Sequence, residues 1–246
     1  MSNLSISLAL GVVAGLANMF GGVIVTARPW SRTFLAYFIA LGSGFMLATA
    51  LTEMIPESIR IASPGAAWPA PLLILIGYFI VHFFEHTWPA HFHFGEETHP
   101  HEFFDAGVAY SALGGLLIHT FFDGVAIASG FLVSRWLGAV IFGAVILHNV
   151  PEGFTMASIM SAAGKSRRAG LGAVTALAVS RILGILAMEL TEHFVSYGLA
   201  LSGGVTLYVA ASDLIPEVNK MRGLKIALTV AAGVGMVILL RWLFFG

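Results

Sequence analysis

Residues 137–160 read LGAVIFGAVILHNVPEGFTMASIM. The run is apolar apart from a polar group around His148, and it exceeds the roughly 20 residues that a helix needs to cross a bilayer. Apolar runs this continuous do not match the alternating strands of a membrane barrel, and backbone groups in lipid need internal partners. We therefore expect a membrane-spanning helix here, with polar side chains held inside the membrane.

Further apolar runs of similar length lie on both sides of this one. The eight predicted spans are 5–26, 33–56, 71–90, 107–132, 137–160, 170–190, 195–217 and 223–245. Of the 246 residues, 58% are hydrophobic and 10% are charged, whereas soluble domains average about 25% charged residues. This composition excludes a soluble globular protein, a disordered chain and a nucleic-acid-binding protein. We predict an all-α polytopic membrane protein with a single transmembrane domain over 1–246.

The basic residues orient the predicted spans. Eight Lys and Arg residues fall in the breaks after odd-numbered spans, three fall on the opposite side, and Arg181 lies inside span 6. Because cytoplasmic loops carry the excess of positive charge, both termini are expected outside a cell membrane. The first run lacks preceding basic residues and a clear cleavage motif, so it is interpreted as a span and not as a signal peptide.

Two internal repeats are visible. The segment 41–57 resembles 201–217, with identities at Leu41, Gly44, Leu47, Ala50, Ile55, Pro56 and Glu57 and their matches 160 residues later. The segment His119 to Gly124 resembles His148 to Gly153. Both repeats join spans of opposite direction, and inverted repeats are typical of transporters that bind substrate near the membrane midplane. Coincidence between small apolar residues is the alternative.

The second repeat carries the chemistry. His119 and Asp123 are four residues apart and share a helix face, as do His148 and Glu152. A carboxylate at the bilayer centre costs about 2.5–3.5 kcal/mol, and two close together repel. A divalent cation resolves both problems, and imidazole, carboxylate and the Asn149 amide oxygen suit Zn²⁺, Fe²⁺, Mn²⁺ or Cd²⁺. The alternative is a buried ion-pair network without a metal.

The segment His148-Asn-Val-Pro-Glu-Gly153 resembles the HNxPEG signature of span 5 in the ZIP (Zrt-, Irt-like) metal transporters, including prokaryotic members. The His119 to Gly124 segment resembles its span 4 partner. The resemblance implies metal ligands at His119, Asp123, His148, Asn149 and Glu152. It also implies a homodimer, and a moving unit of spans 1, 4, 5 and 6 that slides like an elevator against spans 2, 3, 7 and 8.

Three further positions lie where ZIP members place functional residues. Met46 falls where some bacterial members place a thioether ligand, although it also suits an apolar core. Thr120 stands where many members have Asn. Arg181 stands where members with two metals place a Glu, and a fixed cation cannot ligate a metal. We expect Arg181 to neutralise Asp123 or Glu152 at a site for one ion, or else to form a structural pair with another acid.

Acids and histidines also mark the ends of the spans. Glu53 and Asp213 occupy matching places at opposite mouths, either as relays for the cation or as ordinary interfacial charge. Six histidines lie from the last part of span 3 into the predicted cytoplasmic loop 91–106: His82, His86, His91, His93, His99 and His101. Such tracts bind metal, so this stretch is either a metal-sensing segment or a polar loop with incidental affinity.

These features predict a transporter that moves a divalent cation, Zn²⁺ first among the candidates, into the cytoplasm by alternating access. The ion is the substrate, and we expect neither a resident cofactor nor enzyme activity. The partners expected are the metal and the lipid bilayer, without nucleic acid, and the missing GxxxxGK[ST] motif argues against nucleotide. The alternatives are an intramembrane zinc-dependent hydrolase and a metal sensor without flux.

Overall fold

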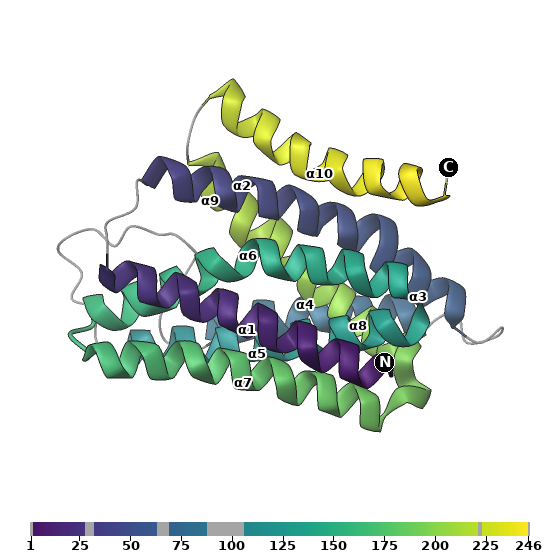
Figure 1. Ribbon diagram of the computed structural model, residues 1–246, viewed down its shortest axis with the longest axis horizontal. Helices are drawn as coiled ribbons and strands as arrows, with labels where there is room; N and C mark the ends of the chain where they lie inside the picture. Colours follow the sequence, from purple (N-terminus) through teal and green to yellow (C-terminus); the bar gives the residue numbers. More distant parts are fainter. Residues whose placement is uncertain (1, 28–31, 63–68, 88–105, 221–222, 246) are drawn as a thin grey trace.

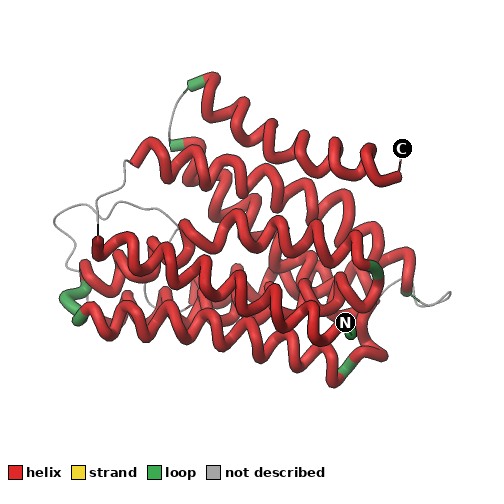
Figure 2. Tube along the Cα trace, in the orientation of Figure 1, coloured by secondary structure: helices red, strands yellow, loops and turns green. Residues whose placement is uncertain are grey.

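The computed structural model describes residues 2–27, 32–62, 69–87, 106–220 and 223–245. The long helices in Figure 1 are α1 (Asn3–Ala27), α2 (Arg32–Thr49), α4 (Pro69–Thr87), α5 (Ala106–Val133), α6 (Arg135–Ala162), α7 (Arg167–Leu190), α8 (Val195–Tyr208) and α10 (Leu224–Phe245). The short ones are α3 (Ile55–Ile61), α9 (Ile215–Asn219) and a 3₁₀ turn, Glu192–Phe194. Within these described ranges there is no strand (Figure 2), which confirms the all-helical prediction.

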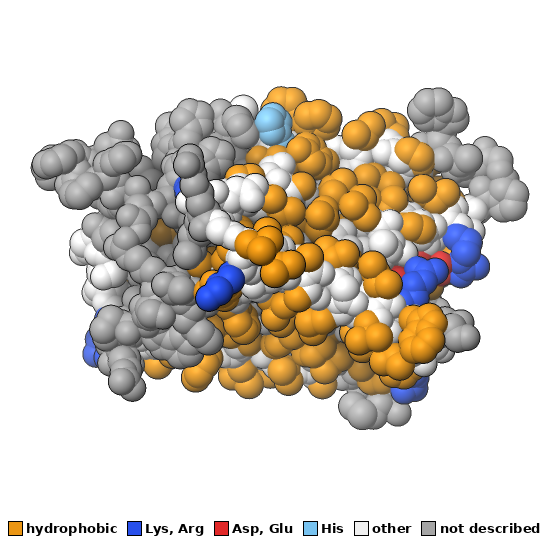
Figure 3. All heavy atoms as spheres, turned by 90° about the horizontal axis from the view of Figure 1, so that it is seen from above, with side chains coloured by type: hydrophobic (Ala, Val, Ile, Leu, Met, Phe, Trp, Pro, Cys, Tyr) orange, Lys and Arg blue, Asp and Glu red, His pale blue; other side chains and the backbone are white. Residues whose placement is uncertain are grey.

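Seven helical segments of the described chain are long and apolar enough to cross a membrane. They correspond to seven of the eight predicted spans. The predicted span 71–90 coincides with α4, whose apolar part, Pro69–Phe84, is shorter than the other seven. Large apolar side chains such as Leu16, Leu75 and Leu239 are exposed, and Figure 3 shows hydrophobic side chains over much of the visible face. These features fit a helical protein that crosses the bilayer several times.

The long helices pack in two groups. Helices α1, α5, α6 and α7 pack on one another, while α2 packs on α10 and α4 packs on α8. In Figure 1, α10 and α2 lie along the upper edge and α1 and α7 along the lower edge. Contacts of α5 with α8 and of α2 with α6 join the two groups. Helices α5 and α6, which carry the two His-x-x-x-acid motifs, are therefore central in the bundle.

Pairs of glycines hold neighbouring helices at very close range. In what we call a glycine clasp, a glycine of each helix faces a backbone carbonyl of the other so closely that an added Cβ would overlap its oxygen. The inner clasps are Gly124 with the carbonyl of Arg181 and Gly184 with that of Phe121 in α5/α7, and Gly21 with that of Val150 and Gly153 with that of Asn18 in α1/α6. Such contacts require the missing side chain of glycine.

The outer helix pairs repeat the clasp. The contacts are Gly44 with the carbonyl of Val230 and Gly233 with that of Leu41 in α2/α10, and Gly77 with that of Leu201 and Gly204 with that of Ile74 in α4/α8. Gly44 and Gly204 are 160 residues apart, as are Leu41 and Leu201. Each half of the sequence repeat thus uses the same small residue for the same kind of contact.

Two π-helical turns interrupt the spans at matching places. The turn Ala50–Met54 joins α2 to α3, and the turn Val209–Leu214 joins α8 to α9. Each turn precedes an Ile-Pro-Glu sequence, and a proline cannot donate to the carbonyl four residues before it. At the first turn this is the carbonyl of Thr52, which accepts a hydrogen bond of 2.9 Å from Arg241 of α10. The apolar pattern of the sequence predicts plain helices here and gives no sign of either turn.

Candidate metal centre

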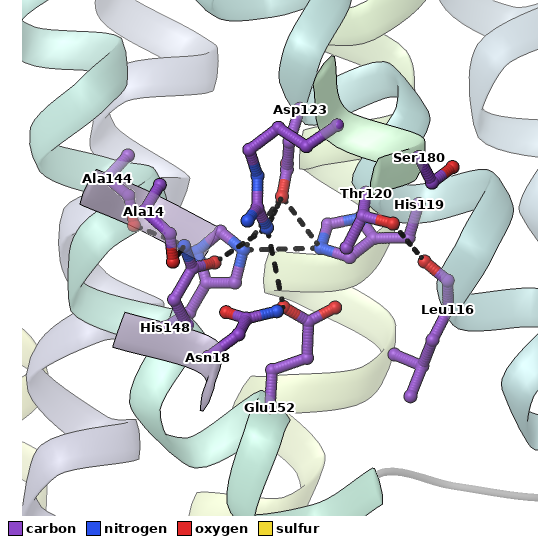
Figure 4. A network of polar contacts seen from close by, with 12 residues as sticks. Ala14, Asn18, Leu116, His119, Thr120, Asp123, Ala144, His148, Glu152 and Ser180 are labelled. Carbon is purple, nitrogen blue, oxygen red and sulfur yellow. Dashed lines mark hydrogen bonds and ion pairs between the residues drawn. The ribbon is translucent and has the colours of Figure 1, made fainter. Parts of the chain in front are cut away.

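The two His-x-x-x-acid motifs face each other across α5 and α6. His119, Asp123, His148 and Glu152 are all buried, between 1% and 4% exposed. Figure 4 shows the two imidazoles pointing toward each other, with the carboxylates of Asp123 and Glu152 on opposite sides of them. The predicted pairs on one face of each helix are therefore brought together inside the bundle.

Three potential ligand atoms converge tightly. Nε2 of His148 lies 3.2 Å from Nε2 of His119 and 3.2 Å from Oδ2 of Asp123, while Nε2 of His119 lies 3.6 Å from the same oxygen. One ligand atom from each of the three residues lies within 4.8 Å of the others, which is compatible with a shared metal ion. Imidazole nitrogen with carboxylate oxygen is a donor set for first-row divalent metals.

A backbone carbonyl orients the His148 ring. Nδ1 of His148 donates to the carbonyl of Ala144, one turn earlier on α6, at 2.8 Å. With the proton assigned to Nδ1, the lone pair of Nε2 is directed at His119 and Asp123. A metal-binding histidine typically makes this kind of supporting hydrogen bond from its other nitrogen. Helix α6 thus presents His148 in the tautomer that a cation needs.

Arg181 of α7 enters the same cluster. Its side chain is fully buried, and its NH2 group lies 3.3 Å from Oδ2 of Asp123 and 3.6 Å from Oε2 of Glu152. The same group donates to Oδ1 of Asn149 at 2.9 Å. The geometry therefore places a fixed positive charge within 4 Å of both carboxylates, and its role at a metal site stays a prediction.

Two amides complete the surroundings of the cluster. Asn149 uses both ends of its side chain, because Nδ2 donates to the carbonyl of Ala14 at 2.9 Å and Oδ1 accepts from Arg181. Asn18 of α1, which the sequence analysis missed, donates from Nδ2 to Oε2 of Glu152 at 3.0 Å. The available signal was a lone amide inside the apolar part of the first span.

A comparison with models of known protein families identifies the family to which the chain belongs. The model described as "ZIP Zinc transporter" matches residues 96–241, which include all of α5, α6, α7 and α8 and most of α10. The chain belongs to the ZIP zinc transporter family. The resemblance seen at His148 to Gly153 is thereby confirmed, and the cluster lies within the matched part.

Curated ZIP proteins are similar to this chain over different lengths. The metal cation symporter ZIP14 of Mus musculus is 24% identical over 85% of this chain and 59% of its own length. Zinc transporter ZIP9 of Xenopus tropicalis is 24% identical over 87% of this chain and 86% of its own. Human zinc transporter ZIP4 is 32% identical over 44% of this chain and 17% of its own. This ZIP chain thus spans little more than half of mouse ZIP14.

Two further residues that the ZIP resemblance singled out have other contacts in the structure. The hydroxyl of Thr120 donates within its own helix to the carbonyls of Leu116 and Leu117, at 2.8 and 3.2 Å. Met46 is buried in an apolar cluster that includes Val140 and Ala144 of α6. Neither observation tests metal binding by these residues, so both assignments stay predictions.

The mouth acids sit in the two π-helical turns. Glu53 accepts hydrogen bonds from Nε1 of Trp136 at 3.2 Å and from NH1 of Arg241 at 2.8 Å, and these bonds connect the first turn to α6 and α10. Asp213 is buried in the second turn. A role for either acid in a cation path stays a prediction.

The six histidines from His82 to His101 are only partly covered by the structure. The ring of His82 contacts the rings of Phe79, Phe83 and Tyr208. The side chain of His86 lies outside the described residues, as do His91, His93, His99 and His101. The predicted loop 91–106 is outside them as well, except for Ala106, which begins α5. Metal binding by this stretch stays a prediction.

Proposed function

We propose that this ZIP family chain transports divalent metal cations, with Zn²⁺ as the first candidate substrate, into the cytoplasm across a cell membrane. The observation that carries the proposal is the convergence of His119, Asp123 and His148 ligand atoms in a buried place on two central helices. A buried His/carboxylate cluster is energetically costly in a membrane, and such clusters typically mark functional sites. Family membership favours transport over the hydrolase and sensor alternatives.

In this proposal His119, Asp123, His148 and Glu152 bind the ion directly. Two carboxylates and Arg181 give the empty site a net charge of −1, and a bound dication changes it to +1. Arg181 occupies the space that a second metal would need and already supplies positive charge there, so the site holds one ion at a time. Asn149 and Met46 are further candidate ligands, and Fe²⁺, Mn²⁺ and Cd²⁺ are further candidate substrates.

The limit of one ion has a direct test. Arg181→Glu replaces the guanidinium with a carboxylate ligand beside Asp123 and Glu152, and we expect two bound ions per chain. The measurement is the metal content of purified protein after equilibration with Zn²⁺, with the wild type as control. An unchanged stoichiometry in a folded variant would contradict the role given to Arg181.

We further propose eight spans, with α4 as the third, both termini outside, and an inverted relation between spans 1–3 and 6–8. The matched clasp glycines Gly44 and Gly204 support the repeat. So do the two π-helical turns before Ile-Pro-Glu. Spans 4 and 5 form the second antiparallel pair, which carries the site, and the whole of 1–246 forms one domain.

Alternating access in this proposal moves α1, α5, α6 and α7 against the remaining long helices. Support comes from the packing, because the clasps that surround the site lie within this group, in α1/α6 and α5/α7. Glu53 and Asp213 mark the opposite mouths, the histidines from His82 to His101 receive or sense the ion, and the homodimer follows the family resemblance.

The decisive experiment is Zn²⁺ uptake into sealed proteoliposomes. We expect saturable uptake by the wild type and its loss in His148→Ala and Glu152→Ala, with competing divalent ions ranking the substrates. Glu57→Gln is the matched control, because Glu57 pairs with Arg60 at the helix end, away from the cluster. Uptake retained in correctly inserted His148→Ala would refute this site, and Zn²⁺ binding without flux would favour a sensor.

A further inference from the structure

Asn18 is a fully buried amide in the middle of an apolar helix of the ZIP chain. A polar side chain placed there needs hydrogen-bonding partners, because neither lipid nor the apolar core supplies them. Its Nδ2 donates to Oε2 of Glu152 across the contact between α1 and α6. Asn18 therefore lies beside a proposed metal ligand although the two residues are 134 positions apart in the chain.

The backbone holds Asn18 at this place. Gly153, the residue after Glu152, approaches the carbonyl of Asn18 so closely that an added Cβ would overlap it. Gly21, one turn further along α1, meets the carbonyl of Val150 in the same way. This clasp sets the distance between Asn18 and Glu152 through main-chain packing, so the amide is presented to the site without the entropic cost of ordering a long side chain.

The two amides near the site differ in what their oxygens do. Oδ1 of Asn149 already accepts a hydrogen bond from Arg181. Oδ1 of Asn18 is buried and has no hydrogen-bond donor within the part of the chain that the structure describes. Because Nδ2 of Asn18 is committed to Glu152, the amide orientation is determined and its oxygen remains an acceptor. A buried acceptor on a side chain that contacts the carboxylate of Glu152 suits a cation.

We propose that Asn18 is a further residue of the cation site, with Oδ1 as a neutral oxygen ligand and Nδ2 holding Glu152 in place. This inference rests on the proposed function, because it adds a ligand to the same site. A neutral donor raises the number of ligands without adding negative charge, so the Arg181 guanidinium still balances one of the two carboxylates when the ion has left.

The test compares metal affinities of purified full-length protein in detergent by calorimetry. Asn18→Leu keeps the approximate size of the side chain and removes both polar atoms, and we expect Zn²⁺ to bind at least about tenfold more weakly. Ser7→Ala is the matched control, since Ser7 is another fully buried polar residue of α1. Thermal unfolding of each variant establishes that it is folded.

A second variant separates ligation from support of Glu152. Asn18→Met places a soft thioether where the amide oxygen was, and softer ligands favour Cd²⁺ over Zn²⁺. We expect the ratio of Cd²⁺ affinity to Zn²⁺ affinity to rise by about tenfold or more. A residue that only supports Glu152 would change both affinities together. Leu16→Met, on the exposed side of the same helix, is the matched control and should leave the ratio unchanged.

The possible results distinguish failure of this inference from failure of the proposed function. Wild-type affinities in both Asn18 variants, with binding lost in Glu152→Ala, would overturn this inference and leave the proposed function standing. Equal changes of the Cd²⁺ and Zn²⁺ affinities in Asn18→Met would leave Asn18 only a support for Glu152 and would also overturn it. Failure of the wild type to bind any divalent ion would remove the proposed function and the inference together.

Discussion

The helix pairs α1/α6 and α5/α7 are built alike but carry different polar groups at the same place. In each pair, a residue three positions before a clasp glycine contacts the acid that precedes the partner's clasp glycine. Asn18 reaches Glu152 in this way, and Arg181 reaches Asp123. The comparison teaches that main-chain packing sets where a side chain meets the acid, while the residue type sets the charge delivered there.

The largest expected difference between the two pairs is in the stability of the zinc-free protein. Arg181→Met leaves Asp123 and Glu152 buried without a cation, and we expect a loss of about 3–5 kcal/mol, as for other broken buried ion pairs. Asn18→Leu removes one hydrogen bond to a carboxylate and should cost about 1–3 kcal/mol. Thermal unfolding in detergent without metal measures both.

Adding Zn²⁺ provides a second test of the difference between Arg181→Met and Asn18→Leu. A bound dication replaces the charge of Arg181, so added Zn²⁺ should restore much of the melting temperature lost in Arg181→Met. The wild type, treated in the same way, is the control for ordinary stabilisation by ligand. Equal losses in Arg181→Met and Asn18→Leu, with no difference in their response to Zn²⁺, would break the contrast between the two pairs.

A smaller effect is expected from changing the clasps themselves. Gly153→Ala and Gly124→Ala each place a methyl group against a backbone carbonyl, and overpacking of this kind costs about 1–3 kcal/mol. Both variants should lose stability and uptake to a similar extent, because the clasps are equivalent. Gly172→Ala on α7 is the matched control, since an added Cβ there meets nothing within 4 Å.

If Gly153→Ala and Gly124→Ala differ strongly in stability or in uptake, the helix pairs α1/α6 and α5/α7 are not equivalent. A Gly172→Ala loss as large as that of Gly124→Ala would also mean that the effect comes from α-helical glycine in general and not from close contact. Stability in detergent and uptake in proteoliposomes, measured on the same preparations, distinguish these results.

The smallest effect is expected where a charge lies at the end of a clasped pair. Arg241 of α10 bonds Glu53 and the carbonyl of Thr52, but its side chain is 56% exposed. The pair is only half exposed, because Glu53 is buried, so Arg241→Met should lower stability by about 1 kcal/mol, at the upper end of the range for exposed ion pairs. Zn²⁺ affinity should not change.

Arg60→Met is the control for this outer charge, because Arg60 forms an exposed pair with Glu57 in the same region. A loss of stability in Arg241→Met as large as that in Arg181→Met would show that the position of a charged residue along the bundle does not decide how much it contributes to stability. Melting temperatures of the three variants, determined side by side, give the answer.

Much of the helical arrangement was predictable because it depends on local sequence. The apolar run 137–160 is long enough to span a bilayer, and the structure has α6 across that stretch. The four-residue spacing of His119 and Asp123 places both on one face of any α-helix, whatever surrounds it. The facing motifs of α5 and α6 follow from this spacing together with the family signature at His148 to Gly153.

The π-helical turns were not predictable at this level. A proline inside an apolar run indicates a disturbed helix, but it does not say how the chain repairs it. At Thr52 the repair comes from Arg241, a residue 189 positions away. The outcome depends on which helix lies alongside, and helical periodicity contains no information about that.

The sequence by itself determined the long apolar helices, the two His-x-x-x-acid faces and the ZIP family, because these depend on composition, spacing and a short motif. Only the tertiary structure decided that Asn18 meets Glu152, and that the Asn149 oxygen faces Arg181. The physical reason is the glycine clasp: the missing side chains of Gly21 and Gly153 let two main chains touch, and that contact selects which polar side chains share the site.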